Sequence, residues 1–295
     1  MAKPDPELVN RILIPFDFSE TAELSMEHVL FMAKLVKAEI LLLHIVEQVS
    51  FTTAISQALG GVEKKIETAS VEKLQAYADE VHAKSGITIT VRTEVGRVYR
   101  KINEVANDWK ADLIIMGTHG AHGYQKFSLG TNTSRVVQEA PCPVLSVQTH
   151  ATGLGFKKIV LPIDESAESR QKVPFAVGLA QFYGAQIILL GIINFSGEEL
   201  IRRFKIKVEQ VEDYVVNHGL DYETVYREGN DLAGITLRTT EELGADLLVI
   251  MTEQEPSITG FLLGTYATRV VNNCRIPVLS IHPTEVDPDK ITVRF

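Results

Sequence analysis

The sequence predicts an α/β protein with two tandem doubly wound parallel sheets of five strands each, because short apolar segments alternate with amphipathic helical segments and the whole series occurs twice. Apolar runs this short are typical of parallel strands that are covered by helices on both faces. In the first half we expect strands at residues 11–15, 40–46, 87–91, 112–116 and 143–147.

Segments with helical periodicity connect these strands. The first helix begins after Asp17 or Ser19, either of which is a suitable N-cap. A polar stretch with glycines, residues 50–61, is expected to lead into the second helix, which ends at Gly86. A third helix follows Gly96, and a short fourth helix precedes the last strand.

The second half of the chain repeats the first. Residues 158–166 resemble residues 11–19 at an offset of 147, and residues 277–281 resemble residues 143–147 at an offset of 134. The smaller offset indicates a deletion, which the comparison places in the second helix of the second half, residues 196–219. We therefore interpret the chain as a tandem duplication.

The repeat predicts two domains. The first covers residues 1–150 and the second covers residues 156–295, and a linker rich in small residues joins them. Each is long enough to bury a core of its own.

Composition narrows the classes of partner and the cellular location. The net charge of −9 argues against broad contact with nucleic acid, which requires a basic surface. The sequence lacks an apolar run of the roughly 20 residues that a membrane span needs, and its N-terminus lacks the apolar core of a secretory signal. We therefore expect a cytoplasmic protein without membrane contact. Its cysteines, Cys142 and Cys274, are interpreted as plain thiols.

A glycine-containing stretch, residues 116–131, follows the fourth apolar strand and precedes a helix. Its sequence, MGTHGAHGYQKFSLGT, is typical of a phosphate-binding loop, because glycines let consecutive backbone amides face one anion. Gly130 and Thr131 add a helix N-terminus. If the strand order is 3-2-1-4-5, a ligand would sit at the carboxyl ends of the first and fourth strands, where Asp17 and Gly117 would face each other.

Several motifs resemble those of the universal stress protein family. The spacing Gly-x-x-Gly-x9-Gly-Thr at residues 117–131 looks like that family's ATP-binding signature, and Ile-Pro-x-Asp-x-Ser at 14–19, Leu-Leu-His-Ile at 42–45 and Pro-Val-Leu-Ser-Val at 143–147 are similar to it as well. The resemblance covers almost the whole chain twice. It implies a tandem protein with the adenine nucleotide alpha hydrolase-like fold, strand order 3-2-1-4-5, that binds ATP or another adenine nucleotide with or without Mg²⁺.

The same resemblance implies a set of nucleotide-binding residues. Asp17 would lie near the ribose or a phosphate-bound metal, and the backbone of Ile45 would contact adenine. Glycines of the loop would line the ribose and the first phosphates, and the helix after the loop would hold the outer phosphates. The complete expected set is Pro15, Asp17, Ile45, Met116, Gly117, Gly120, Gly130, Thr131 and Asn132.

The second half departs from this signature in its loop. Aligning Met251 with Met116 gives the segment one extra residue, so that Gly117 corresponds to Thr252 and Gly120 lies nearest to Glu255. Carboxylates beside a triphosphate repel it, and side chains at the glycine positions obstruct close approach. We therefore expect a nucleotide in the first half and a degenerate, empty site in the second.

Three function classes follow from these observations. The leading hypothesis is a stress-response module that binds an adenine nucleotide in its first half and acts as a sensor or regulator through an unidentified protein partner. The first alternative is a slow ATPase that uses Asp17 and Mg²⁺, but the sequence offers no clear general base, nucleophile or arginine finger, so we expect no enzyme and no catalytic residues. The other alternative is a nucleotide-free scaffold.

The last strand of each half is expected to be an edge strand. Residues 144–147 and 278–281 are apolar, and such edges favour pairing. The resemblance to universal stress proteins implies dimerisation through these strands. We therefore predict an intramolecular pseudo-dimer of the two halves, with a further homodimer left open.

Overall fold

The computed structural model of the chain describes residues 9–35, 37–47, 53–118, 131–148, 154–166, 168–252, 254–257 and 260–283. It divides at residue 150 into two compact units, which are described separately. In the described part of the chain, none of the helices combines the length and apolar character needed to span a membrane.

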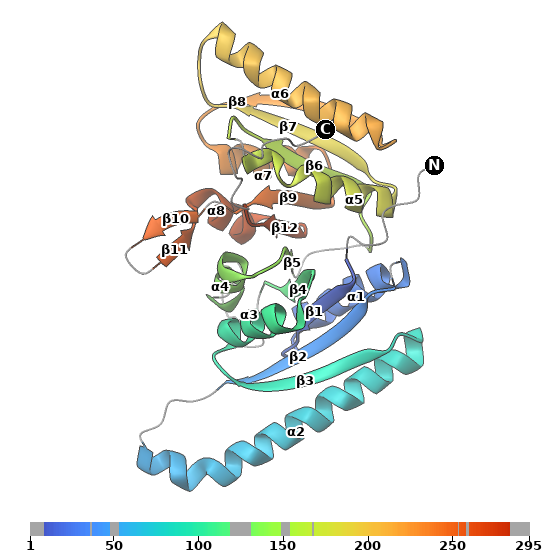
Figure 1. The fold of residues 1–295 in the computed structure, drawn as a ribbon, viewed down its shortest axis with the longest axis vertical. Helices are drawn as coiled ribbons and strands as arrows, with labels where there is room; N and C mark the ends of the chain where they lie inside the picture. The colour runs from blue at the N-terminus through green and yellow to red at the C-terminus, as the bar shows by residue number, and fades with distance from the viewer. Residues whose placement is uncertain are drawn as a thin grey trace. The chain divides into compact units, whose positions relative to one another are not determined.

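The first unit contains a parallel sheet with the order β3-β2-β1-β4-β5 (Figure 1). Its strand β1 pairs with β2 on one side and with β4 on the other, so the winding direction reverses between β1 and β4. This arrangement confirms the strand order that the sequence predicts. The strands are β1 (Arg11–Pro15), β2 (Glu39–Glu47), β3 (Ile89–Gly96), β4 (Leu113–Gly117) and β5 (Val144–Val147).

The second unit repeats this sheet with the order β8-β7-β6-β9-β12. In addition, an antiparallel hairpin of β10 and β11 takes up the segment that corresponds to the glycine loop, which the sequence did not predict. The strands are β6 (Lys158–Ile163), β7 (Gln186–Ile193), β8 (Tyr222–Glu228), β9 (Leu247–Met251), β10 (Gln254–Ser257), β11 (Gly260–Leu263) and β12 (Val278–Ile281).

Helices cover both faces of each sheet. In the first unit α1 packs on β1, β4 and β5 and α2 packs on β2 and β3, whereas α3 packs on β2 and β3 beside α4. Right-handed crossovers explain the two layers, because the winding reverses at β1. The helices are α1 (Glu20–Leu35), α2 (Thr53–Ser85), α3 (Val98–Trp109), α4 (Thr131–Glu139), α5 (Val173–Tyr183), α6 (Glu198–Asn217), α7 (Leu232–Glu242) and α8 (Thr265–Asn273).

The second helix differs most between the two halves. Helix α2 has 33 residues and α6 has 20, which confirms that the shortening falls in this helix. The expectation that residues 50–61 only lead into α2 is wrong for most of the stretch, because the helix already begins at Thr53. Gly60 and Gly61 lie inside it, at a cost of about 1 kcal/mol each relative to alanine.

In both halves, an aspartate carboxylate binds the backbone at the amino end of the first strand. The carboxylate of Asp112 accepts hydrogen bonds from the backbone amides of Asn10 (2.8 Å) and Arg11 (2.9 Å). Asp246 does the same for the amide of Lys158 (3.0 Å). These carboxylates fix the register of neighbouring strands at the edge of each sheet opposite the predicted ligand site.

Candidate functional site

The candidate site of the first half lies at the carboxyl ends of β1 and β4. Strand β1 ends at Pro15, which is paired with Leu43 of β2, and the amide of Phe16 donates to the Leu43 carbonyl (2.8 Å). Strand β4 ends at Gly117, in register with Val147 of β5. Ligands of doubly wound sheets bind at such a reversal point, since the loops that follow the two strands diverge there.

Ser19 and Asp17 together form the entrance to α1. The amide of Ala22 donates to Ser19 Oγ (3.3 Å), so Ser19 is the N-cap. Asp17 Oδ1 accepts the amide of Ser19 (3.1 Å) and thereby holds the turn. Phe18, between them, has a φ of 62°, a left-handed conformation that is costly for a bulky residue. The exposed carboxylate of Asp17 is therefore presented by a constrained turn.

Gly117 is a glycine because of its contact with α1. A Cβ built on Gly117 would lie 2.5 Å from Thr21 Oγ1 and 3.0 Å from the Thr21 carbonyl carbon, which no real side chain tolerates without a shift. Gly117 does not have a positive φ. Glycine is therefore required at this position by close packing and not by a left-handed backbone, and this packing brings the end of β4 against the first turn of α1.

Thr133 ties the first turn of α4 to the end of β4. Its buried hydroxyl donates to the carbonyl of Gly117 (3.0 Å) and lies 3.4 Å from that of Thr118. The helix therefore begins beside the strand end, with Thr131 exposed and Asn132 half-buried in its first turn. Because amides at a helix N-terminus favour an anion, this geometry suits phosphate.

Ile45 and Met116 occupy the strands that flank the reversal point. Ile45 is half-buried near the end of β2, two positions beyond Leu43, and is in register with Glu94. Met116 is buried, in register with Ser146. Of the predicted site residues, Gly120 and Gly130 lie outside the described residues.

Aromatic residues that sequence reasoning did not identify hold the loop after β1. The rings of Phe16 and Tyr77 lie 4.5 Å apart, and the Lys73 ammonium lies 3.8 Å from the ring centre of Phe18. His44 contributes Nδ1, 2.8 Å from the carbonyl oxygen of Phe16. Burial, together with nearby glutamates, raises the pKa of Tyr77 to about 12. Helix α2 therefore supports the turn that carries Asp17.

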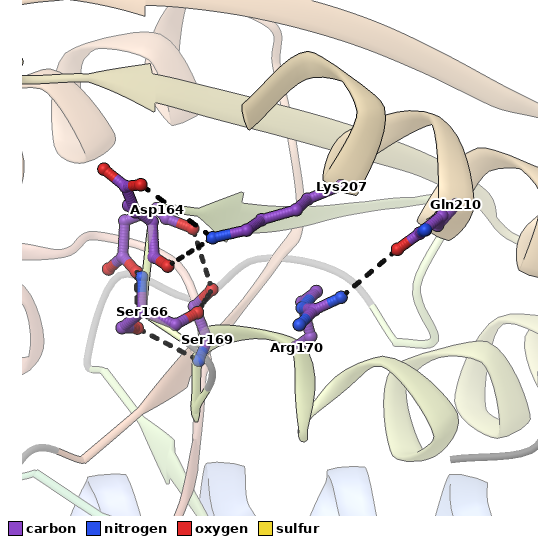
Figure 2. Close-up of polar contacts among 7 residues, drawn as sticks. Asp164, Ser166, Ser169, Arg170, Lys207 and Gln210 are labelled. Carbon is purple, nitrogen blue, oxygen red and sulfur yellow. Dashed lines mark hydrogen bonds and ion pairs between the residues drawn. The ribbon is translucent and has the colours of Figure 1, made fainter. Parts of the chain in front are cut away.

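The corresponding loop of the second half has the same two hydrogen bonds as the turn of Asp17 and Ser19 in the first half (Figure 2). Asp164 Oδ1 accepts the amide of Ser166 (2.8 Å), and Ser166 Oγ accepts the amide of Ser169 (3.2 Å). From α6, Lys207 Nζ donates to the carbonyl of Glu165 (3.1 Å). The contact resembles that of Lys73 in the first half, since a lysine of the second helix reaches the same loop.

The start of the first helix differs between the halves. In the second half a short 3₁₀ turn, Glu168–Arg170, precedes α5, which begins only at Val173. By the offset of 147, the start of α1 at Glu20 would correspond to residue 167. The first α-helical turn of the second half is thus replaced.

Lys172 is a buried cation in this altered turn. It is 2% exposed, and its Nζ donates to the carbonyl of Ser169. Burial lowers its pKa to about 8, while the negative charge of Asp164 acts in the opposite direction. The same position in the first half is Ser25, whose hydroxyl donates to the Thr21 carbonyl (2.7 Å). A buried lysine thus replaces a small buried hydroxyl one helical turn after Thr21.

The pairing of β9 corrects the sequence alignment of the loop. Gly117 is in register with Val147, and Met251 is in register with Ile281, its counterpart at the offset of 134. Gly117 therefore corresponds to Met251 and not to Thr252, and this segment contains no extra residue. By the same offset Gly120 corresponds to Gln254, not to Glu255. The misalignment arose because methionine occurs one position apart at the ends of β4 and β9.

The corrected alignment gives the second half a bulkier and more internally bonded site. Met251 is buried where the first half has glycine, and a side chain there requires the first helical turn to lie elsewhere, as it does. In the hairpin, Gln254 pairs with Leu263 and Glu255 with Leu262, so their backbones bond each other. The position of Asn132 holds Tyr266, whose Oη lies 3.2 Å from Thr236 Oγ1.

The model of the universal stress protein family matches residues 9–148 and again residues 155–282. The chain belongs to the universal stress protein family. It is a tandem member, because each half matches the family model by itself.

Known universal stress proteins resemble either one half or the whole chain. A universal stress protein of Methanocaldococcus jannaschii is 30% identical over 155 residues, 48% of this chain and 96% of its own length. A solved universal stress protein from Archaeoglobus fulgidus DSM 4304 shares the fold with a TM-score of 0.74 and 19% identity, over 93% of this chain and 98% of that chain. A universal stress protein solved in complex with cAMP matches 44% of this chain and 99% of that chain, with 23% identity and a TM-score of 0.37.

Proposed function

We propose that this universal stress protein binds an adenine nucleotide in its first half. The observation that supports the proposal is the convergence of the Asp17 turn, the end of β4 at Gly117 and the N-terminus of α4 at one edge of the sheet. In the proposed complex the amides of Thr131 and Asn132 would face the phosphates, and Asp17 would lie near the ribose or a phosphate-bound metal. Ile45 contributes its backbone to the adenine, and Pro15 and Met116 end the flanking strands.

Mg²⁺ would enter this site together with the phosphates. Among the described residues, the chain does not assemble three His, Cys, Asp or Glu side chains as a ready metal site. Asp17 offers one exposed carboxylate, and Mg²⁺ bound through one carboxylate plus phosphate oxygens is a common arrangement. The residues therefore fit a nucleotide-borne Mg²⁺, which would neutralise phosphate charge.

We infer that the second half does not take part in nucleotide binding. Met251 fills the position of Gly117, Lys172 replaces Ser25, and the loop backbone is paired in the hairpin. Asp164 and the Gly264–Thr265 step are retained, and Asp164 accepts the amide of Ser166 just as Asp17 accepts that of Ser19, so the exclusion rests on the first three differences. The second half then serves as a partner for the first and not as a second sensor.

The proposed role is that of a sensor or regulator in which the nucleotide alters contact with a protein partner. Edge pairing of the two halves and a homodimer remain predictions, which analytical ultracentrifugation and cross-linking test. Slow ATP hydrolysis remains the alternative, and single-turnover hydrolysis at protein excess distinguishes the two. If the wild type hydrolyses ATP and the Asp17→Asn variant does not, the function is catalysis and not binding alone.

Mass spectrometry of small molecules released from the freshly purified protein tests the proposal. We expect an adenine nucleotide, and we expect thermal unfolding to shift upward on addition of ATP, ADP, AMP or cAMP, since a ligand at 100 times its Kd adds about 2.7 kcal/mol. If neither a copurified nucleotide nor a thermal shift is observed, the protein is a nucleotide-free scaffold.

A further inference from the structure

Two arginines, one on α3 and one on α4, flank Tyr99 in the first half. Arg100 Nε donates to Tyr99 Oη (3.1 Å), and the guanidinium of Arg135, on α4, lies 4.7 Å from the centre of the Tyr99 ring. The hydrogen bond from Arg100, more than any other cause, lowers the pKa of Tyr99. Two cations from different helices are therefore held around one tyrosine.

The second half has an internal carboxylate at the same place. Asp231 is the N-cap of α7, and its Oδ1 accepts the amide of Gly234 (3.2 Å). Arg269 Nη1 lies 2.7 Å from the same oxygen. A helix N-terminus and an arginine thus bind an anion that the chain itself supplies.

The first half keeps the arginine and loses the carboxylate. At the offset of 134, Arg135 corresponds to Arg269, and Asp231 corresponds to Arg97, which is the N-cap of α3 without any side-chain cap. Gly234 corresponds to Arg100. In the second half both Arg269 and Arg238 face Asp231, and Glu104 takes the position of Arg238 in the first half. The helix start itself therefore changes from one carboxylate to two arginines, Arg97 and Arg100.

Neighbouring carboxylates do not compensate for this change. Glu94 and Glu104 are both paired with Lys101, at 3.6 Å and 2.7 Å. Among the residues that the structure describes, none of the ion pairs of the first half involves Arg97, Arg100 or Arg135. The arginines are exposed and available to a ligand.

We propose that Arg97, Arg100 and Arg135 form a second anion site that binds a phosphoryl group. Arg100 and Arg135 both lie beside Tyr99, and Arg97 is the residue at the start of the same helix as Arg100. A dianionic phosphate suits this group of cations better than a single carboxylate does, and guanidinium groups bind phosphate oxygens in bidentate fashion. In the second half, a Cβ at Gly234 would lie 2.1 Å from Asp231 Oδ2. Arg100 has a Cβ at the equivalent position, so an anion bound in the first half must lie further from the helix than the Asp231 carboxylate does. The first-half ligand is therefore held mainly by side chains.

The test is a ³¹P NMR titration of the full-length protein with inorganic phosphate. We expect Arg135→Leu to weaken phosphate binding at least about tenfold, because a charge-assisted contact is lost. Arg97→Asp restores the internal carboxylate of the second half, so it abolishes phosphate binding while raising the thermal unfolding temperature. Arg269→Leu is the matched control, and it leaves phosphate binding unchanged.

Gly130→Asp separates this site from the nucleotide site. We expect it to abolish ATP binding and to keep phosphate binding. Addition of saturating ATP to the wild type then shows where the bound phosphoryl group comes from. If ATP displaces phosphate, the site holds a phosphate of the nucleotide, and if both bind at once, it holds free phosphate. Either result supports the site. The proposal is overturned if the wild type binds no phosphate, if Arg97→Asp binds it normally, or if Gly130→Asp abolishes it.

Discussion

Gly117 and Thr21 are packed so closely that a Cβ on Gly117 would lie 2.5 Å from the Thr21 hydroxyl oxygen. This contact joins the end of β4 to the first turn of α1, the two segments that border the candidate site. The second half, with Met251 at the glycine position, has a 3₁₀ turn in place of that helical turn. This position is therefore one of those at which the two halves differ beside the candidate site.

Gly117→Ala tests this contact. We expect the variant to lower the free energy of unfolding of the first half by about 1 to 3 kcal/mol, because overpacking forces the helix or the strand to shift. Differential scanning calorimetry of the full chain measures the change. Met251→Leu, a volume-conserving change at the equivalent position, is the control and should cost less than about 1.5 kcal/mol. An unchanged unfolding temperature in Gly117→Ala contradicts the account.

Thr133→Ala tests the tie between α4 and β4. The variant removes a hydroxyl that donates to the Gly117 carbonyl, and the second half already has alanine, Ala267, at this position. We expect stability to fall by about 1 kcal/mol and ATP to bind more weakly, since the helix N-terminus is no longer fixed. Thr133→Ser keeps the hydroxyl and should retain most of the affinity. Equal losses in both variants would show that the hydroxyl is not the cause.

Lys172 predicts a pH dependence of the second half. Its pKa is lowered from 10.5 to about 8 in the folded protein, so between these values the unfolded chain binds more protons. Stability therefore rises as the pH increases from about 8 towards 10.5, by about 1 to 3 kcal/mol in total. Chemical denaturation at a series of pH values measures this slope. The Lys172→Met variant should lose this dependence of stability on pH, and the control Lys207→Met should keep it because Lys172 is intact. If Lys172→Met keeps the dependence, Lys172 is not its cause.

We predict that the two cysteines react with alkylating reagents in the unfolded protein but not in the native protein. Burial raises the pKa of Cys142 to about 12 and that of Cys274 to about 11, and both are free and buried. Because the thiolate is the reactive form, we expect neither to be alkylated by iodoacetamide at pH 8 in the native state, and both in urea. Mass spectrometry of the alkylated protein distinguishes the states. Rapid native alkylation would mean that these thiols are accessible and reactive.

The duplication could be predicted because it depends on local patterns that recur along the chain, whereas the strand order followed from the resemblance to universal stress proteins. Apolar runs marked the strands, and the offset between the halves correctly placed the deletion in the second helix. The roles of Asp17 and Ser19 in one turn also follow from residue types that favour capping. The duplication, the strand positions and the turn require no knowledge of contacts between distant segments.

Features that depend on contacts between distant segments could not be predicted from the sequence. The contact between Gly117 and Thr21 joins residues far apart in the sequence, so the glycine was attributed to backbone freedom. The match of Gly117 to Met251 required strand register, which the neighbouring methionines obscured. Likewise, the burial of Lys172 was not expected from a charged residue near a helix start.

The central claim is that the first half alone binds the nucleotide. Isothermal titration calorimetry of the full chain with ATP, in the wild type and in Gly130→Asp and Gly264→Asp variants, tests it most directly. We expect one nucleotide per chain in the wild type, none in Gly130→Asp and one in Gly264→Asp. Two nucleotides per chain, or binding that is lost in Gly264→Asp and kept in Gly130→Asp, would contradict the account.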